Sequence, residues 1–186
     1  MTRPSAGFTV IELLVVSGII ALISGLVLVN NNRFGGEVLL QNLAYDIALS
    51  IRQAQQFGIS VQRFQGGFGA PYGMHFQSSG ASAQSVYVLF ADAVDENGLY
   101  DGGEIVQSTT VSQGYRIVDL CVTPPDSTEV CGLTSLDITF KRPEPDAYIR
   151  SAGIGNLNES ARIRLTSPRG DQKEVTVEAN GQISVQ

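Results

Sequence analysis

The strongest constraint in this sequence is an apolar run over residues 8–29 that contains a single ionisable residue, Glu12. As an α-helix this run would be about 33 Å long, which is enough to cross the hydrocarbon core of a bilayer. A carboxylate inside such a segment costs about 2.5–3.5 kcal/mol on insertion scales, so we expect Glu12 to have a partner or a function. The run predicts a membrane helix and disfavours a purely cytosolic globule.

Small residues recur along the same run. Ser17 and Ser24 are seven residues apart, as are Gly18 and Gly25, so each pair lies near one face of a helix. Small residues at one face let membrane helices pack closely, although glycine and serine are also common in spanning helices generally. Both interpretations stay open.

Three fates of the N-terminal segment compete. A cleaved secretory signal would have small residues in an A-x-A-like pattern after the apolar run, but Asn30, Asn31, Asn32 and Arg33 follow instead. An uncleaved anchor, or cleavage before the run, therefore remains.

The residues around the start of the run carry a specific motif. Arg3 lies in a short leader that ends at Gly7, and Phe8, Thr9 and Glu12 follow. This pattern closely resembles the N-terminus of type IV prepilins, the family that includes the type II secretion pseudopilins. The resemblance implies that a membrane-embedded prepilin peptidase cuts between Gly7 and Phe8 and N-methylates Phe8. The cationic amine of Phe8 would then pair with Glu12 of a neighbouring subunit.

The resemblance implies a structural subunit, a minor pilin or pseudopilin, and not an enzyme. It would sit in the inner (cytoplasmic) membrane as a single-pass protein with its head outside the cytoplasm. Membrane lipid would surround its helix until it joined other pilin or pseudopilin subunits in a pilus or secretion pseudopilus. The particular machine, whether for secretion, adhesion or DNA uptake, stays open. The alternative is an unprocessed membrane-anchored extracytoplasmic module that binds calcium or another ligand.

A second helical pattern covers residues 30–58. Leu39, Leu43, Ile47 and Ile51 recur every four residues and form an apolar stripe, which predicts packing against a core. Many major pilins have a proline within their long helix, whereas this chain has none between Pro4 and Pro71. We therefore expect a slight bend or an interruption at 30–36 instead of a proline kink.

The remainder of the chain has the pattern of a β-rich domain. Short β-rich segments alternate with turn signals at 72–76, 86–90, 105–110, 115–122, 136–140, 161–166, 174–178 and 183–185. Asn180-Gly181 predicts a hairpin, and 167–171 predicts a turn. The predicted fold is α+β: a long N-terminal helix, membrane-spanning in its first half and amphipathic in its second, packed on an antiparallel β-sheet head.

The predicted organisation has four parts: a leader at 1–7, a transmembrane and assembly helix at 8–29, an amphipathic helix at 30–58 and an extracytoplasmic head at 59–186. A helix carrying Arg52-Gln53-Ala54 ahead of a β-rich domain looks most like the GspH/FimT-type minor pseudopilins.

Cys121 and Cys131 flank a proline-containing loop. A head outside the cytoplasm predicts that they form a disulfide. Free thiols are the alternative, and two thiols without a nearby histidine are too few ligands for structural zinc.

An acidic loop at 92–104 resembles the calcium loops of EF-hands and dockerins. With Gly98 as the sixth residue of such a loop, several oxygen-bearing side chains fall on ligand positions, but the acid expected at the first position is displaced by one residue. The candidate ligands are Asp92, Asp95, Asn97, Asp101 and Glu104. Ca²⁺ is the ion that such oxygens favour. The alternative is a polar hairpin tip.

Composition and motifs exclude other functions. The chain has 18 acidic and 12 basic residues, a net charge of −6, which disfavours strong nucleic-acid binding. The single histidine, His75, alternates with apolar residues and is expected on a sheet surface, and no nucleophile or phosphate-binding motif is present. Lys141 and Arg142 begin a proline-rich segment of mixed charge, which predicts an exposed turn and not a binding patch.

Overall fold

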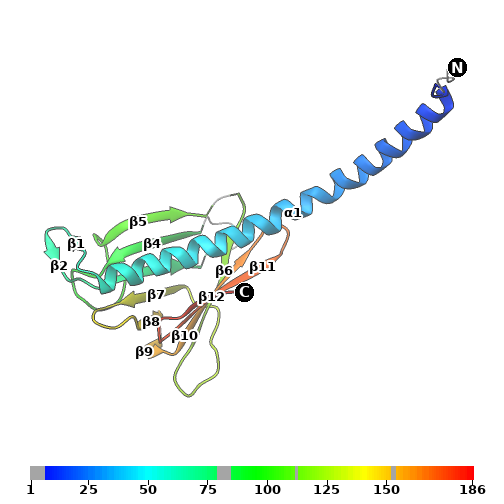
Figure 1. Ribbon diagram of the computed structural model, residues 1–186. Helices are drawn as coiled ribbons and strands as arrows, with labels where there is room; N and C mark the ends of the chain where they lie inside the picture. The colour runs from blue at the N-terminus through cyan, green and yellow to red at the C-terminus, as the bar shows by residue number, and fades with distance from the viewer. Residues whose placement is uncertain (1–6, 79–84, 112, 152–153) are drawn as a thin grey trace. The chain divides into compact units, whose positions relative to one another are not determined.

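The computed structural model describes residues 7–78, 85–111, 113–151 and 154–186 (Figure 1). The chain divides into two compact units, Met1–Val38 and Leu39–Gln186. Helix α1 (Val10–Ile59) runs through the boundary, and strands β1–β12 all lie in the second unit. The fold is thus α+β in its elements: an N-terminal helix, apolar in its first part, followed by antiparallel sheets.

Helix α1 is one element of 50 residues. Its backbone is helical through 30–36, so the helix is not interrupted where the polar Asn-rich segment predicted an interruption. The two predicted helices, 8–29 and 30–58, are therefore consecutive parts of a single helix. Of the predicted leader, residues 1–6 lie outside the described part of the chain.

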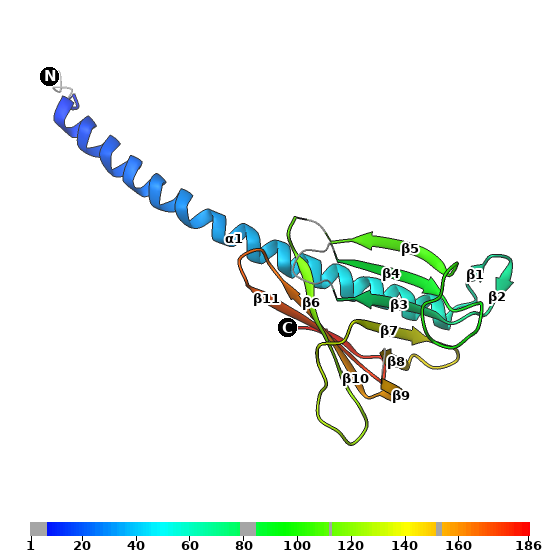
Figure 2. The same ribbon diagram turned by 180° about the vertical axis from the view of Figure 1, so that it is seen from behind.

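The strands form three antiparallel sheets. β1 (Arg63–Phe64) pairs with β2 (Gly67–Phe68). The largest sheet has six strands in the order β5-β4-β3-β7-β8-β9, and Figure 2 shows β5, β4 and β3 side by side. Its strands are β3 (Tyr72–Gln77), β4 (Val86–Ala91), β5 (Ile105–Thr110), β7 (Ser135–Phe140), β8 (Ala147–Ser151) and β9 (Ile154–Asn158).

The third sheet has four strands in the order β12-β11-β10-β6. They are β6 (Arg116–Thr123), β10 (Ser160–Thr166), β11 (Gln172–Glu178) and β12 (Ile183–Val185). Both predicted turns are confirmed. The Gly170 N–H donates to the Ser167 carbonyl between β10 and β11, and the Gly181 N–H donates to the Glu178 carbonyl between β11 and β12.

One apolar cluster in the second unit contains side chains of α1 and of both larger sheets. The buried α1 members lie three or four residues apart along one face, with Ala48 beside Ile47: Leu40, Ala44, Ile47, Ala48, Ile51 and Ala54. They belong to the same cluster as Phe76, Ile138, Phe140, Leu120 and Ile163. Burying an isoleucine side chain such as that of Ile47 or Ile51 contributes about 1.5–3 kcal/mol.

One member of the predicted apolar stripe of α1 lies off the buried face. Leu39 is 46% exposed, whereas Ile47 and Ile51, farther along the same row, are buried, as is the neighbouring Leu40. A spacing of exactly four residues drifts around a helix of 3.6 residues per turn, so the row that begins at Leu39 reaches the core face only at its later members.

The end of α1 makes specific contacts with the sheets. The Gln55 side chain donates to the carbonyls of Pro145 (2.9 Å) and Gly181 (3.0 Å). Gly58 lies so close to the backbone of Phe140 that a Cβ at this position would collide with the Phe140 carbonyl. These contacts fix the last turns of the helix within the second unit.

Candidate functional site

The N-terminal segment begins α1 with a reciprocal cap. The Thr9 hydroxyl accepts a hydrogen bond from the Glu12 N–H at 3.3 Å, while Glu12 Oε2 accepts from the Thr9 N–H and hydroxyl, each at 3.5 Å. This is a capping box, in which a threonine and a glutamate three residues later satisfy free N–H groups of the first helical turn. Glu12 therefore has a local role in starting the helix.

The prepilin-like motif predicts an intersubunit role for Glu12 and does not predict this local one. The signal was present, because T-x-x-E directly before an apolar run is the pattern of a capping box. Phe8 lies just outside the helix with 83% of its surface exposed, and a Cβ on Gly7 would contact nothing within 4 Å. Gly7, Phe8 and Glu12 thus lie together at one exposed helix start.

The helix that follows is apolar and uncovered in the single chain. Val10–Leu28 has a mean hydropathy of 2.5, so it is long and apolar enough to span a membrane, and none of its residues is buried in the structure. An added Cβ at Gly18 or Gly25 would meet nothing within 4 Å. The surface at both glycines is therefore available for lipid or for another helix.

The acidic loop at 92–104 connects β4 to β5 and is organised by Glu104. This side chain is fully buried. Glu104 Oε1 accepts from the N–H groups of Ala93 and Val94, each at 2.9 Å, and Oε2 accepts from the Asp101 N–H at 3.0 Å. Hydrogen bonds to a charged group are stronger than neutral ones, so Glu104 closes the loop from within.

The other acidic loop residues have separate positions. Asp92 is buried and its Oδ2 accepts from the Gly98 N–H at 2.7 Å, while its Oδ1 has no hydrogen-bond partner among the described residues. Asp101 Oδ2 accepts from the Asn97 side chain at 2.9 Å. Asp95 is exposed on the loop surface.

The structure therefore uses most of the predicted calcium ligands in hydrogen bonds within the loop. Within the described ranges, the one group of three or more His, Cys, Asp or Glu ligand atoms lying within 4.8 Å of one another is elsewhere, at Asp119, Cys121 and Cys131. The geometry of the loop supports the hairpin-tip interpretation better than a cage of converging oxygens. Calcium binding by Asp92, Asp95, Asn97, Asp101 and Glu104 stays a prediction.

Burial has an electrostatic consequence at Asp92. Desolvation raises the pKa of its carboxyl above the ordinary value of 3.8, and the hydrogen bond from Gly98 acts in the opposite direction. The folded chain then binds this proton more tightly than the unfolded chain. The resulting stability is fully present below pH 3.8 and is lost as the pH rises through the raised pKa of the folded state.

We expect Asp92→Asn to remove this loss of folding stability at higher pH. The free energy of unfolding of the variant relative to the original chain should increase as the pH rises from 3.8 towards neutrality, since the amide does not ionise. Urea unfolding at a series of pH values, followed by tyrosine fluorescence, measures the difference. A difference in the free energy of unfolding that stays constant over this range would contradict the assignment, because it would reflect the packing of the amide and not the ionisation of Asp92.

The predicted disulfide between Cys121 and Cys131 is present. Its flanking loop is held further by Asp119, which accepts from the Gly132 N–H at 2.9 Å and pairs with Arg164 at 3.0 Å. This explains why Asp119 lies near the two sulfur atoms. Both sulfur atoms are in the disulfide, so they are not available as thiolate ligands for a metal ion. Asp119, Cys121 and Cys131 instead stabilise the loop together.

Removal of the disulfide should lower stability by about 2–3 kcal/mol through the greater freedom of the unfolded chain. The variant is Cys121→Ala with Cys131→Ala, compared with the original chain by urea unfolding. A reductant should destabilise the original chain by a similar amount and leave the double variant unchanged. An original chain that is indifferent to reductant would show that the bond contributes nothing.

His75 forms a small polar cluster on β3. Its Nδ1 lies 2.7 Å from Asp137 Oδ1 on the adjacent strand β7, and its ring is 4.9 Å from that of Tyr100. The Tyr100 N–H also donates to Asp137 Oδ1 at 3.3 Å. His75 was expected on a sheet surface, and it lies there beneath the 92–104 loop, where the cluster holds Tyr100 against the sheet.

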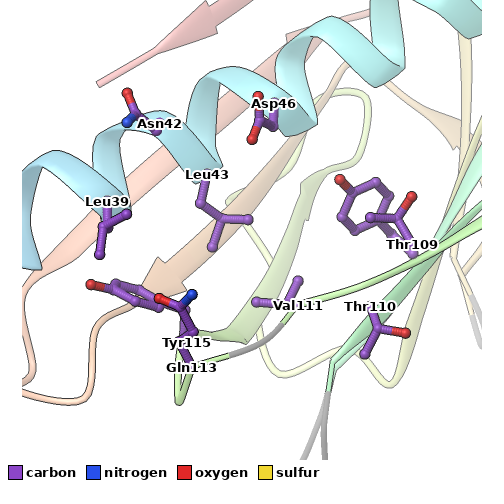
Figure 3. Close-up of a pocket in the computed structure, with 10 residues that line it drawn as sticks. Leu39, Asn42, Leu43, Asp46, Thr109, Thr110, Val111, Gln113 and Tyr115 are labelled. Carbon is purple, nitrogen blue, oxygen red and sulfur yellow. The ribbon is translucent and has the colours of Figure 1, made fainter.

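A cavity of about 250 Å³ lies between α1, the start of β4 and the end of β5 (Figure 3). Leu39 and Leu43 point from α1 towards Val111 and Tyr115. Asn42, Asp46, Tyr87, Thr109, Thr110 and Gln113 complete its lining. The partial exposure of Leu39 follows from its position at this hollow.

Comparison with known proteins gives no match to a family model, to a curated protein or to a solved structure.

Proposed function

We propose that this chain is a prepilin-like structural subunit, cleaved after Gly7, N-methylated at Phe8 and assembled through its N-terminal helix into a type IV pilus or a type II secretion pseudopilus. The observation that carries the proposal is the sequence Gly7-Phe8-Thr9 with Glu12, placed at the start of a helix whose apolar surface has no cover in the single chain.

The exposed helix surface supports this function physically. Large apolar side chains such as Leu13, Leu22 and Leu26 are each more than 60% exposed. Such a surface is stable in lipid or against equally apolar helices, and both environments would serve one subunit in turn. The chain would be a single-pass protein of the inner membrane with its head outside the cytoplasm, and afterwards part of a fibre.

The head supports the same proposal. A disulfide is typical of an oxidising compartment outside the cytoplasm. We further propose a pilin-like layering in which the second half of α1 lies on the six-stranded sheet. The shared apolar cluster and the contacts of Gln55 and Gly58 support this layering.

The mature N-terminus tests the proposal. The full chain is expressed in membranes together with a prepilin peptidase, and the intact protein and its N-terminal fragment are measured by mass spectrometry. We expect a chain that begins at Phe8 and carries one additional methyl group.

Gly7→Val should retain Met1, because the family's leader ends in glycine. Gly102→Val is the matched control, since a Cβ at Gly102 would meet nothing within 4 Å, and it should be processed normally. If the original chain kept Met1 in the presence of active peptidase, the proposal would be wrong. An unprocessed membrane-anchored binding module would then be the better description.

A further inference from the structure

A second cavity, of about 410 Å³, lies at one end of the six-stranded sheet. Its walls come from the 92–104 loop, from the residue that precedes β3, from the end of β7 with the segment that follows it, and from β8. The lining residues are Pro71, Asp92, Glu96, Gly98, Thr139, Lys141, Arg142, Tyr148 and Arg150. This volume is within the range of sites for small organic molecules, about 300–1,000 Å³.

Two arginines of this cavity lie against glycines. The Arg150 guanidinium occupies the space that a Cβ on Gly98 would need, and Arg142 Nη2 lies 2.6 Å from the position of a Cβ on Gly69. Both glycines have positive φ angles, +76° and +94°. Glycine is the residue that adopts this backbone conformation at little cost and leaves room for another group. The backbone thus provides a place for each guanidinium.

Neither guanidinium has a hydrogen bond or an ion pair with the residues that the structure describes. Lys141 differs, because it pairs with Glu96 at 3.4 Å. Arginine presents a planar set of N–H donors that matches the two oxygens of a carboxylate. Two such groups without partners in one cavity are a recognition element for an anionic group.

The acidic side of the cavity limits the charge of the ligand. Glu96 is exposed there, and buried Asp92 lies in the wall with an unpartnered Oδ1. Repulsion from these carboxyl groups is larger for a phosphate dianion than for a carboxylate.

We propose that this cavity is a binding site for a carboxylate group, held by the guanidinium groups of Arg142 and Arg150. The site is independent of the N-terminal assembly helix, and it gives the head a ligand chemistry beyond its structural role. The sequence pattern does not predict this cavity, because Arg150 lies in a strand that has little β signal and the predicted exposed turn at 141–146 gives no sign of a cavity.

Titration with propionate, which carries a single carboxylate, tests the proposal. The ¹⁵N-labelled full chain in non-ionic detergent micelles is titrated at constant ionic strength, and the arginine Nε–H signals are followed by NMR. We expect saturable changes in two signals, which are assigned to Arg142 and Arg150 by their disappearance in Arg142→Gln and Arg150→Gln. Each variant should bind propionate about tenfold more weakly or worse, the loss expected for one charge-assisted pair.

Arg150→Lys keeps the charge and the fold but lacks the planar fork, and it should also bind more weakly. Arg169→Gln is the matched control in an exposed turn and should bind as the original chain does. Signal changes that stay linear in propionate, or saturable changes that are confined to other arginines, would overturn the proposal. Tighter binding of inorganic phosphate at the same ionic strength would overturn the choice of carboxylate.

Discussion

Glu12→Gln should reduce assembly into fibres at least a hundredfold, while the subunit remains in the membrane. In the proposed fibre, the methylated amine of Phe8 pairs with Glu12 of a neighbour among apolar helices. Removing one partner of a buried ion pair leaves the other charge unpaired and costs about 3–5 kcal/mol. Immunoblotting of sheared fibres against the membrane fraction measures the ratio.

The capping box provides the control for this experiment. Glutamine at the same position can still cap the helix, so Glu12→Gln removes the charge and largely keeps the local structure. Thr9→Ala does the reverse: it removes the capping hydroxyl, at a cost of about 1 kcal/mol, and keeps the Glu12 carboxylate. Assembly should therefore fail in Glu12→Gln and persist in Thr9→Ala. If Glu12→Gln assembled normally and Thr9→Ala did not, Glu12 would serve helix initiation alone.

Local patterns predicted most of the fold. All segments predicted as strands are strands in the structure, because turn residues such as Asn180-Gly181 bound each of them. β8 was missed because its inward-facing positions are Ala147, Ile149 and Ser151, and alanine and serine give little β signal. β1 and β2 have two residues each, too few to form a pattern.

The candidate sites also differ in how far local sequence patterns predict them. The cap at Thr9 and Glu12 joins residues three apart, so the sequence contains it in full. The clustering of Arg150 with Gly98, or of His75 with Asp137, depends on strand order and register, which no local pattern specifies. The acidic loop is an intermediate case: its residue types suggested a cation, whereas its backbone geometry directs the carboxylates to N–H groups.

Glu104→Ala should destabilise the head by about 3–5 kcal/mol, because three backbone N–H groups would lose a buried anionic acceptor. Glu104→Gln should cost less, about 1.5–3 kcal/mol, since its amide oxygen still accepts but its NH₂ group faces a donor. Asp95→Asn is the control on the exposed side of the loop and should stay within about 0.5 kcal/mol of the original chain. Urea unfolding of the full chain in non-ionic micelles gives all three values.

Stability measured with and without calcium distinguishes two roles of this loop, internal hydrogen bonding through Glu104 and binding of Ca²⁺. Glu104 acts through the N–H groups of Ala93, Val94 and Asp101 in the first role. The free energy of unfolding of its variants should then fall below that of the original chain by the same amount with a chelator as with millimolar calcium. If the loop instead holds Ca²⁺, the ion should stabilise the original chain, as any ligand that binds only the folded state does, and Glu104→Ala should abolish that gain. The hydrogen bonds of Glu104 already use both of its oxygens, so we expect the first outcome. A calcium-dependent loss in Glu104→Ala would show that these oxygens turn towards an ion when one is present.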